Sequence, residues 1–325
     1  MTGAVDSKAN RNASAAPSDR ASLPRYVVVT PAHNEQAFLA KTIESVIRQT
    51  VVPVKWVIVD DGSTDSTAEI VKPYLPNHPW MELVQRPQRK DRNFADKVRA
   101  FNAGYEKVQD LAFEVVGNLD ADVSLDADHL EFLLGKFRDD ERLGVAGTTF
   151  KEEGGYTSER HSFEGHFHVS GQCQLFRRKC FEEIGGYKPN RAGGIDWVAV
   201  TTARMVGWKT RSFREKPFFH HRRLGTAGRS AVSALFVYGE RDYYLGGSPV
   251  WELFRVAYRM TKHPYIFGGL SLGLGYGWAM LRRIPRSVSD ELMAFHRKEQ
   301  MSKQKIILKS LLRFKRVDSF TVLPD

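Results

Sequence analysis

The sequence predicts an α/β protein whose mostly parallel β-sheet carries helices on both faces. The main observation is a regular alternation between short apolar runs rich in Val and Ile and segments with the periodicity of amphipathic helices. A second observation is that two apolar runs end in aspartates, at Asp60-Asp61 and at Asp120-Ala121-Asp122. Acids at the carboxyl ends of parallel strands lie where open α/β sheets bind ligands. The crossovers between such strands are expected to be right-handed.

The first 122 residues contain four expected strands with three helices between them. The helix over 38–49 is justified by Leu39, Ile43 and Val46, which are spaced to form one apolar face. The expected strands cover 26–30, 54–59, 81–84 and 114–119, and the expected helices cover 38–49, 64–71 and 96–108. This order is typical of the nucleotide-binding half of an α/β domain.

Beyond residue 122 the rhythm of the sequence changes. Helices are expected over 128–137, 179–184 and 196–206, and strands over 144–150 and 171–176. The chain therefore divides into a disordered leader at 1–23, a first half at 24–122, a second half at 123–222 that completes the site, and a basic helical region at 223–325.

The net charge of +10 comes entirely from the last third of the chain. Residues 1–221 hold 30 basic and 30 acidic residues, whereas residues 222–325 hold 18 basic residues and 8 acidic ones. No nucleic-acid motif accompanies this basic region, so an anionic membrane surface is the expected partner. The leader lacks the apolar segment of a signal peptide, and the two cysteines, Cys173 and Cys180, are expected to be buried thiols in a reducing compartment. These features predict a protein at the cytoplasmic face of a membrane.

An uncharged, glycine-rich segment at 264–281 is the expected membrane contact. Its 18 residues would extend about 27 Å as a helix, which is marginal for a bilayer core. Gly269 and Gly273 form a small-xxx-small pattern that allows close helix packing. Three interpretations stay open from the sequence: a short span, a re-entrant helix, or a buried core helix.

Several polar motifs stand where expected strands end. Pro31, Asn34 and Glu35 follow the first strand, and Asp60-Asp61-Gly-Ser-Thr-Asp65 follows the second. The second motif also fits an ordinary turn in which Ser63 or Thr64 caps the next helix. An acid at this position can accept the imide N–H of uracil or the hydroxyls of a ribose.

These motifs together resemble the family 2 inverting glycosyltransferases, which have the GT-A type of nucleotide-diphospho-sugar transferase fold. The resemblance continues in order along 25–222, through the helix start at Asp96 to Gly104, the Asp120-Ala121-Asp122 motif, the segments Gly171 to Phe176 and Gly185 to Tyr187, and Asp196-Trp197. Asp120-Ala121-Asp122 is similar to the DxD metal motif of the family. On this resemblance, residues 24–222 form a catalytic domain with a nucleotide-binding half and an acceptor half.

The resemblance implies a role for each motif. Asp196 is implied as the general base, and Mg²⁺ or Mn²⁺ is implied as the cofactor, held by Asp122 and Asp120 with His221, or alternatively His220, completing the shell. The implied nucleotide- and donor-binding residues are Pro31, Asn34, Glu35, Asp60, Asp61, Lys97, Asn102, Asp120, Arg222 and Arg223.

Two positions depart from the family pattern. Asp96 stands where the family usually has glycine and is expected to narrow the donor pocket, and Ile195 replaces the first acid of the family's Glu-Asp pair. The QxxRW motif of the processive synthases is absent, and Phe219-His-His-Arg-Arg223 stands in its place, which argues against a cellulose-synthase-like polymerase.

The leading hypothesis is a metal-dependent inverting glycosyltransferase of exopolysaccharide or surface-glycan synthesis. It would transfer a sugar from a nucleotide-diphospho-sugar, with UDP the expected carrier, to a saccharide acceptor linked to a polyprenyl diphosphate. The alternatives are a nucleotidyltransferase on the same fold and a non-catalytic scaffold of a polysaccharide assembly complex. The nucleotidyltransferase would need a glycine-rich basic loop after the first strand, and residues 31–35 do not provide one.

Overall fold

The computed structural model describes residues 20, 22–89, 93–161, 165–190, 193–222 and 230–313 of the 325-residue chain. Most of the predicted leader and Arg223 therefore lie outside the described residues.

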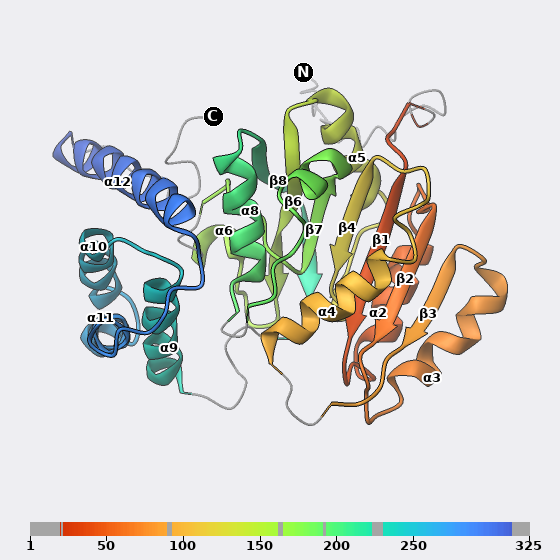
Figure 1. Cartoon of the computed structure of the whole chain (residues 1–325), viewed down its shortest axis with the longest axis horizontal. Coiled ribbons are helices and arrows are strands. Elements are labelled where there is room, and N and C mark those ends of the chain that lie inside the picture. The colour runs from red at the N-terminus through yellow and green to blue at the C-terminus, as the bar shows by residue number, and fades with distance from the viewer. Residues whose placement is uncertain are drawn as a thin grey trace, which may run out of the picture.

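Within the described residues, one sheet contains eight strands in the order β3-β2-β1-β4-β7-β6-β8-β5 (Figure 1). The strands are β1 (Tyr26–Ala32), β2 (Lys55–Asp60), β3 (Met81–Gln85), β4 (Val115–Leu119), β5 (Val123–Ser124), β6 (Leu143–Glu152), β7 (Cys173–Arg177) and β8 (Lys209–His220). The pairs β1–β2, β1–β4, β2–β3 and β6–β8 are parallel, and the pairs β4–β7, β6–β7 and β5–β8 are antiparallel. The mostly parallel sheet predicted from the sequence is thus confirmed.

The helices of the sheet-bearing part follow the predicted order. They are α2 (Leu39–Ile47), α3 (Thr67–Val71) with the 3₁₀ helix η1 (Lys72–Asn77), α4 (Phe94–Tyr105), α5 (His129–Asp139), α6 (Ser158–His161), α7 (Arg178–Glu183) and α8 (Ile195–Met205). Helix α4 begins two residues before its predicted start because Asn93 and Asp96 form a capping box at its N-terminus.

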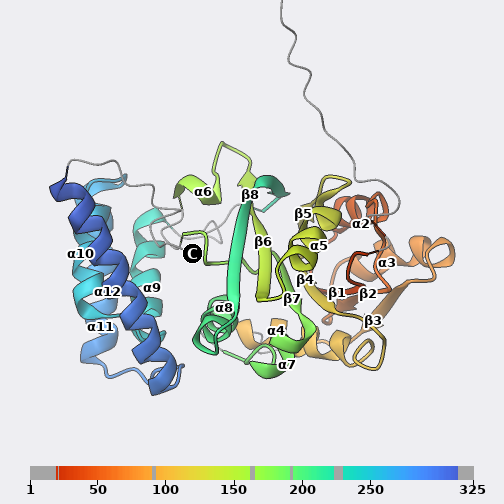
Figure 2. The ribbon, with the colours of Figure 1, turned by 90° about the horizontal axis from the view of Figure 1, so that it is seen from above.

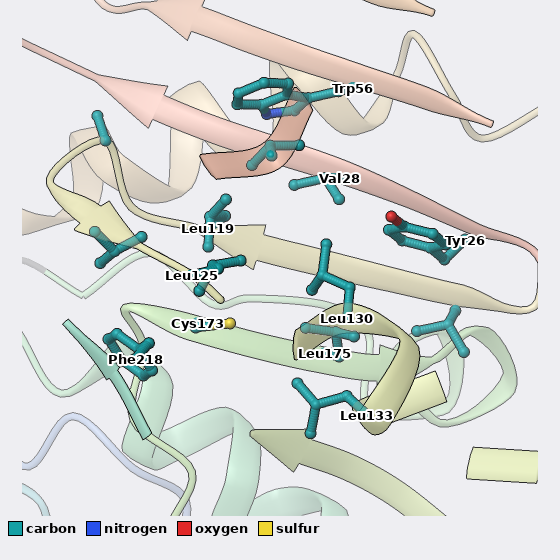
Figure 3. Close-up of a cluster of buried hydrophobic side chains, with 14 of the residues drawn as sticks. Tyr26, Val28, Trp56, Leu119, Leu125, Leu130, Leu133, Cys173, Leu175 and Phe218 are labelled. Carbon is teal, nitrogen blue, oxygen red and sulfur yellow. The ribbon is translucent and has the colours of Figure 1, made fainter. Parts of the chain in front are cut away.

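Both faces of the sheet are buried, and strand β1 shows how. Its alternate residues Tyr26 and Val28 join a cluster with helices α2 and α5, whereas Val27 and Val29 join a second cluster with α4, α7 and α8. Figure 3 shows the first cluster, in which Leu130 and Leu133 pack over Leu175. Every side chain of β1 from 26 to 29 is buried. The sequence of this strand is therefore continuously apolar and does not alternate between apolar and polar residues.

Strand β8 was not expected from the sequence. Its segment, Lys209 to His220, carries basic and acidic residues between its apolar ones and has no clear period-two pattern. It is nevertheless a strand, since it pairs with β6 along most of its length and with β5 at its end. This strand brings His220 beside the Asp122 motif.

The C-terminal region forms four helices beside the sheet domain (Figures 1 and 2). They are α9 (Ala231–Tyr244), α10 (Pro249–Met260), α11 (Tyr265–Leu281) and α12 (Asp290–Leu312). Helix α8 packs against them: Trp197 lies in a buried cluster with Tyr243, Leu245 and Tyr276. The C-terminal helices therefore share a core with the helix that carries Asp196.

The glycines of α11 allow it to pack closely against its neighbours in this chain. A Cβ atom at Gly275 would lie 2.0 Å from the backbone oxygen of Phe236 in α9, and one at Gly269 would lie 2.7 Å from that of Val256 in α10. Helix α11 has 17 residues, and among the described residues no helix is both long and apolar enough to cross a membrane. The interpretation as a full span is therefore not supported, whereas contact with a membrane surface stays a prediction.

Candidate active site

The loops that follow β1 and β2 are joined by Asn34. Its side-chain oxygen accepts a hydrogen bond from the backbone N–H of Thr64 at 2.8 Å, and its own N–H donates to the hydroxyl of Ser63 at 3.0 Å. Asn34 adopts a positive φ of 55°, a conformation that asparagine tolerates better than most residues. This predicted donor-binding residue thus holds two loops together at the edge of the sheet.

The acid pair after β2 is buried and internally satisfied. Asp60 accepts a hydrogen bond from the backbone N–H of Ser63 at 2.9 Å, and Asp61 forms an ion pair of 2.5 Å with Arg86. The turn continues through Gly62, where a Cβ atom would lie 2.5 Å from the backbone of Gln88. The motif is thus a turn, but the expectation that Ser63 or Thr64 caps the next helix was wrong, because the N-cap of α3 is Ser66 and makes no side-chain capping hydrogen bond. Contact of the motif with a nucleoside stays a prediction.

Asp120 and Lys97 form the ion pair at the centre of the strand-end edge. The ammonium of Lys97, from α4, lies 2.6 and 2.8 Å from the two oxygens of Asp120, and the amide of Asn118 donates to Asp120 at 3.2 Å. Burial lowers the pKa of Lys97, but the charges of Asp120, Asp196 and Asp122 outweigh it and raise that pKa overall. Lys97 is therefore a fixed cation among three of the predicted site acids.

Asp122 lies in a separate cluster that joins the ends of β1 and β8. His220 approaches an Asp122 oxygen at 3.5 Å, and the Arg222 guanidinium bridges Asp122, at 3.2 Å, and Glu35, at 2.5 Å. Burial raises the pKa of Asp122, but the hydrogen bond and charge of His220 and the charge of Arg222 outweigh it, so that pKa lies below its ordinary value. Burial and the charge of Asp122 raise the pKa of Glu35 to about 7.

The two histidines of this cluster have different surroundings. The predicted metal ligand His221 directs its Nε2 to the hydroxyl of Ser124 at 2.7 Å and stacks on the ring of Phe38. His220 is the histidine that faces Asp122, and its Nδ1 lies 2.8 Å from Glu152. The geometry thus favours His220 over His221 beside Asp122, because the ring of His221 contacts Ser124 and Phe38 instead.

Asp196 stands in the first turn of α8, after the left-handed Gly194. Its carboxylate accepts a hydrogen bond from the backbone N–H of Gly171 at 3.1 Å and lies 3.8 Å from Nε2 of His168. A Cβ atom at position 171 would lie 2.9 Å from the Cβ of Asp196, so glycine is needed there for this approach. The carboxylate remains about one-third exposed and is accessible to a bound group.

Two cavities meet at Asp196. We call the first the strand-edge cavity; it has a volume of about 310 Å³ and is lined by Lys97, Asp120 and Ile195, among others. The second, here the interhelical cavity, lies between α8 and the C-terminal helices, has a volume of about 310 Å³ and includes Trp197 and Trp251 in its wall. Asp196, Gln172, Gly194 and Arg241 line both cavities. Volumes of this size are at the lower end of those of small-molecule sites.

The remaining predicted residues lie apart from these cavities. Pro31 lies within β1 in register with Val59, and Asn102 is exposed on α4 and lines neither cavity. Asp96 also lies outside the strand-edge cavity: its carboxylate accepts from the N–H of Asn93 at 2.8 Å and pairs with Arg99 at 2.6 Å. Asp96 therefore caps α4, and the expectation that it narrows the donor pocket stays a prediction.

The sequence did not indicate three residues of this site. His168 beside Asp196 and Glu152 beside His220 have no local motif, and Arg241 lies in α9, about 45 residues beyond the acid.

The residues around Asp122 fit a divalent metal ion whose remaining ligands would come from the substrate. Mg²⁺ is usually held by one or two carboxylates together with substrate phosphates, and Asp122 offers such a carboxylate. His220 would be a ligand only when neutral, whereas the charges of Asp122 and Glu152 raise its pKa against the effect of burial. Among the described residues, no group of three or more His, Cys, Asp and Glu side chains forms a ready-made metal cluster.

The fold places the chain in a known structural class. The solved structure of GalNAc-T7 with UDP, GalNAc and Mn²⁺ superposes with a TM-score of 0.56 at 16% identity, over 90% of this chain and 58% of that chain. At this identity the likeness establishes the fold alone, which is the α/β fold of GT-A glycosyltransferases.

A family model described as glycosyl transferase family 2 matches residues 27–192, slightly more than half of the chain. The chain therefore belongs to glycosyltransferase family 2, and the resemblance predicted from its motifs is confirmed. Asp196 and the His220-His221-Arg222 segment follow the matched residues.

The similar curated proteins are glycan synthases. Chondroitin synthase of Pasteurella multocida (strain Pm70) is 28% identical over 127 residues, which are 39% of this chain and 12% of that protein. Chondroitin synthase of Escherichia coli is 28% identical over 195 residues, which are 57% of this chain and 27% of that protein. The chain thus spans about a quarter or less of the length of these relatives.

Proposed function

We propose that this protein is a metal-dependent inverting glycosyltransferase that moves a sugar from a UDP-sugar to a saccharide acceptor in surface-glycan synthesis. The observation that carries the proposal is the position of Asp196, whose carboxylate lies in the wall of both cavities. A general base must contact the acceptor hydroxyl on one side while the donor sugar lies on the other. The strand-edge cavity is then the donor-sugar site, and the interhelical cavity is the acceptor site.

In this mechanism Asp196 accepts the proton of the acceptor hydroxyl as its oxygen attacks the anomeric carbon. The bond from that carbon to the diphosphate breaks in line with the attack, so the anomeric configuration inverts. The hydrogen bond from the N–H of Gly171 orients the Asp196 carboxylate. The pair of Lys97 and Asp120 would orient the donor through its hydroxyl groups, because it lines the same cavity.

Phosphate binding is assigned to the cluster around Asp122. A divalent metal bound there would neutralise charge on the diphosphate, and Asp122 would hold it, with His220 as a second ligand in its neutral form. Arg222 has a guanidinium that already bridges two acids and suits bidentate contacts to phosphate oxygens. The GalNAc-T7 complex, which contains UDP and Mn²⁺ on the same fold, supports the choice of nucleotide and metal.

Nucleotide release from a panel of UDP- and GDP-sugars, with and without Mn²⁺ and membrane extract, tests this function. We expect Asp196→Asn to lower transfer by at least about 100-fold while nucleotide binding persists, because the base is lost and the phosphate site is intact. Asp128→Asn, which changes an acid at the start of α5 outside both cavities, is the matched control. Normal turnover in Asp196→Asn would show that Asp196 is not the general base.

Adding a nucleoside triphosphate and a sugar 1-phosphate to the panel separates the two alternatives. A non-catalytic scaffold would release no nucleotide from any donor, and a nucleotidyltransferase would join the two added substrates into a nucleotide-sugar and release pyrophosphate. The ordered contacts of Asp196 with Gly171 and His168 favour a working base over a scaffold, because they hold a partly exposed carboxylate at the meeting point of two cavities.

We also propose that the C-terminal helices dock on an anionic membrane surface that carries the acceptor as a polyprenyl-diphosphate saccharide. Helix α11 exposes a run of apolar side chains, including Phe267 at 73%, Leu274 at 65% and Leu281 at 80% exposure. The exposed basic residues Lys262, Arg282 and Arg283 stand at its two ends. Apolar side chains between basic residues are typical of helices that lie in the interface of an anionic membrane.

Vesicle flotation tests this docking face on the full chain. Leu274→Ser should reduce binding to vesicles of phosphatidylglycerol and phosphatidylcholine, whereas Val52→Ser, at a similarly exposed apolar position in the sheet domain, should not. Deletion of the region is a poor test, because Trp197 of α8 shares a core with these helices. Equal flotation of both variants would contradict the assignment of α11 to a membrane-docking face. Placement of the protein at the cytoplasmic face stays a prediction.

A further inference from the structure

The interhelical cavity contains several basic side chains, and most of them are paired. Arg204 forms a bidentate ion pair with Glu299, at 2.7 and 2.9 Å, that joins α8 to α12. Arg255 pairs with Asp242 and so joins α10 to α9. These two arginines hold the walls of the cavity together, and their charges are balanced by acids of the chain.

Arg241 differs from these arginines. Its guanidinium lies over the ring of Tyr238, 4.5 Å from the ring centroid, and among the described residues no carboxylate lies within 4.0 Å of it. The side chain is half-buried and lines both cavities together with Asp196. A partly desolvated guanidinium without an acidic partner among the described residues thus lines the space beside Asp196 that a ligand would occupy.

We propose that Arg241 is a substrate-binding residue that recognises an oxyanion on the acceptor saccharide. This inference rests on the proposed function, since it takes the interhelical cavity as the acceptor site. A guanidinium binds carboxylate and phosphate oxygens through two parallel hydrogen bonds, and it binds a neutral hydroxyl more weakly. The indole rings of Trp197 and Trp251 in the same cavity offer apolar faces for the sugar ring.

The position of Arg241 favours the acceptor over the donor diphosphate. The diphosphate is assigned to Asp122 and Arg222, and neither of these residues lines either cavity. Arg241 instead shares its position with Asp196, Gln172 and Gly194, where the two cavities meet. The oxyanion is therefore either the carboxylate of an acidic sugar or a phosphate group on the acceptor, and both present the same chemistry to a guanidinium.

Saturation-transfer NMR on the full chain tests this inference with three probes: glucose, glucuronic acid and glucose 6-phosphate. We expect the wild-type protein to bind at least one acidic probe about tenfold more tightly than glucose, and Arg241→Ala to lose that preference. Arg241→Lys should retain part of it, because the charge remains and the planar fork is lost. Preference for glucuronic acid alone identifies a carboxylate, and preference for glucose 6-phosphate alone identifies a phosphate.

Arg282→Ala is the matched control, because Arg282 also lies over an aromatic ring, that of Trp278 at 4.5 Å, but outside both cavities. It should keep the wild-type preference. Equal binding of all three probes to the wild-type protein, or a preference that survives in Arg241→Ala, would overturn the inference. The nucleotide-release panel tests the proposed function independently. If the protein releases nucleotide from a donor but does not prefer an acidic probe, the proposed function holds and only the role of Arg241 is wrong. If no donor releases nucleotide, the proposed function itself is wrong.

Discussion

The proposed donor and acceptor sides of this site are built from different parts of the chain. The proposed donor side takes Asp60, Asp61, Lys97 and Asp120 from strand ends and one helix start within 61 residues of each other. The acceptor side combines β6, α8 and three C-terminal helices, so that Thr148 and Lys303 line the same cavity. The donor side is thus formed by strand ends that are close in the sequence, whereas the acceptor side is formed by the packing of helices that are far apart in the sequence.

This difference has an energetic consequence. Asp60 has its partner in its own loop, Asp61 pairs with Arg86 in the loop after β3, and Asp120 pairs with Lys97 of α4. The acceptor cavity depends on close contacts between glycine backbones of α9 and α11 and on the ion pair that joins α8 to α12. We therefore expect perturbations of helix packing to remove acceptor binding while nucleotide binding persists.

The largest expected effect follows from Gly275→Ala. A Cβ atom there would lie 2.0 Å from the backbone oxygen of Phe236, and backbone atoms in a helix cannot move aside singly, so we expect a cost of about 3 kcal/mol in stability. Transfer should fall with it, whereas nucleotide binding should persist. Chemical denaturation and nucleotide titration measure the two quantities.

Gly277→Ala is the control on the same helix, because no atom lies within 4 Å of its added Cβ. It should be neutral or should stabilise α11 by about 1 kcal/mol or less. If Gly275→Ala weakened nucleotide binding as much as transfer, the separation of the two sides would be wrong.

A smaller effect concerns Glu252, a buried acid of α10. Burial and the charge of Asp242 raise its pKa to about 7, against the lowering by Arg255. The folded state therefore binds a proton more tightly than the unfolded state, whose pKa is about 4.5, and stability should fall as the pH rises from about 4.5 to about 7. The loss across this window should be about 1–3 kcal/mol.

Denaturation curves at pH 5 and pH 8 measure this effect. Glu252→Gln should reduce the difference between the two curves, because the neutral amide does not titrate. The contribution of Glu35, whose pKa is also raised to about 7, should remain. Glu44→Gln, at an exposed position of α2, should keep the wild-type difference. A pH profile that Glu252→Gln leaves unchanged would assign the dependence to other groups.

The smallest expected effect lies on the donor side, at Asp96. Asp96→Ala removes half of the capping box of α4 and should cost about 1–2 kcal/mol in stability. Its partners Arg89 and Arg99 are exposed by more than 40%, so their ion pairs contribute little. Donor affinity should not change, since Asp96 lies outside the strand-edge cavity.

Asp96→Asn provides the comparison, because its side-chain oxygen can still accept from the N–H of Asn93 and should recover part of the stability. Nucleotide titration of both variants decides whether the carboxylate acts on the donor. Tighter donor binding in Asp96→Ala would show that the Asp96 side chain narrows the donor pocket.

Much of the sheet was predictable because its strands are buried on both faces. Val27 to Val29 and Val57 to Val59 are continuous apolar runs, and the acids that follow them mark the edge where ligands bind. Strand β8 was missed because its pairing with β6 tolerates the mixed charges of Lys209 to His220. The preference for His220 over His221 beside Asp122 depended on that strand and could not be read from two adjacent histidines.

The sequence alone determined the fold class, the family and the position of the acids along the chain, because period and spacing are local properties of a polypeptide. Only the tertiary structure showed that Asp96 caps a helix, that α8 shares a core with the C-terminal helices, and that Asp196 stands between two cavities. These facts depend on which surfaces meet after folding. Contacts between α8 and the C-terminal region join residues about 45 to 95 positions apart, and no local pattern encodes such distances.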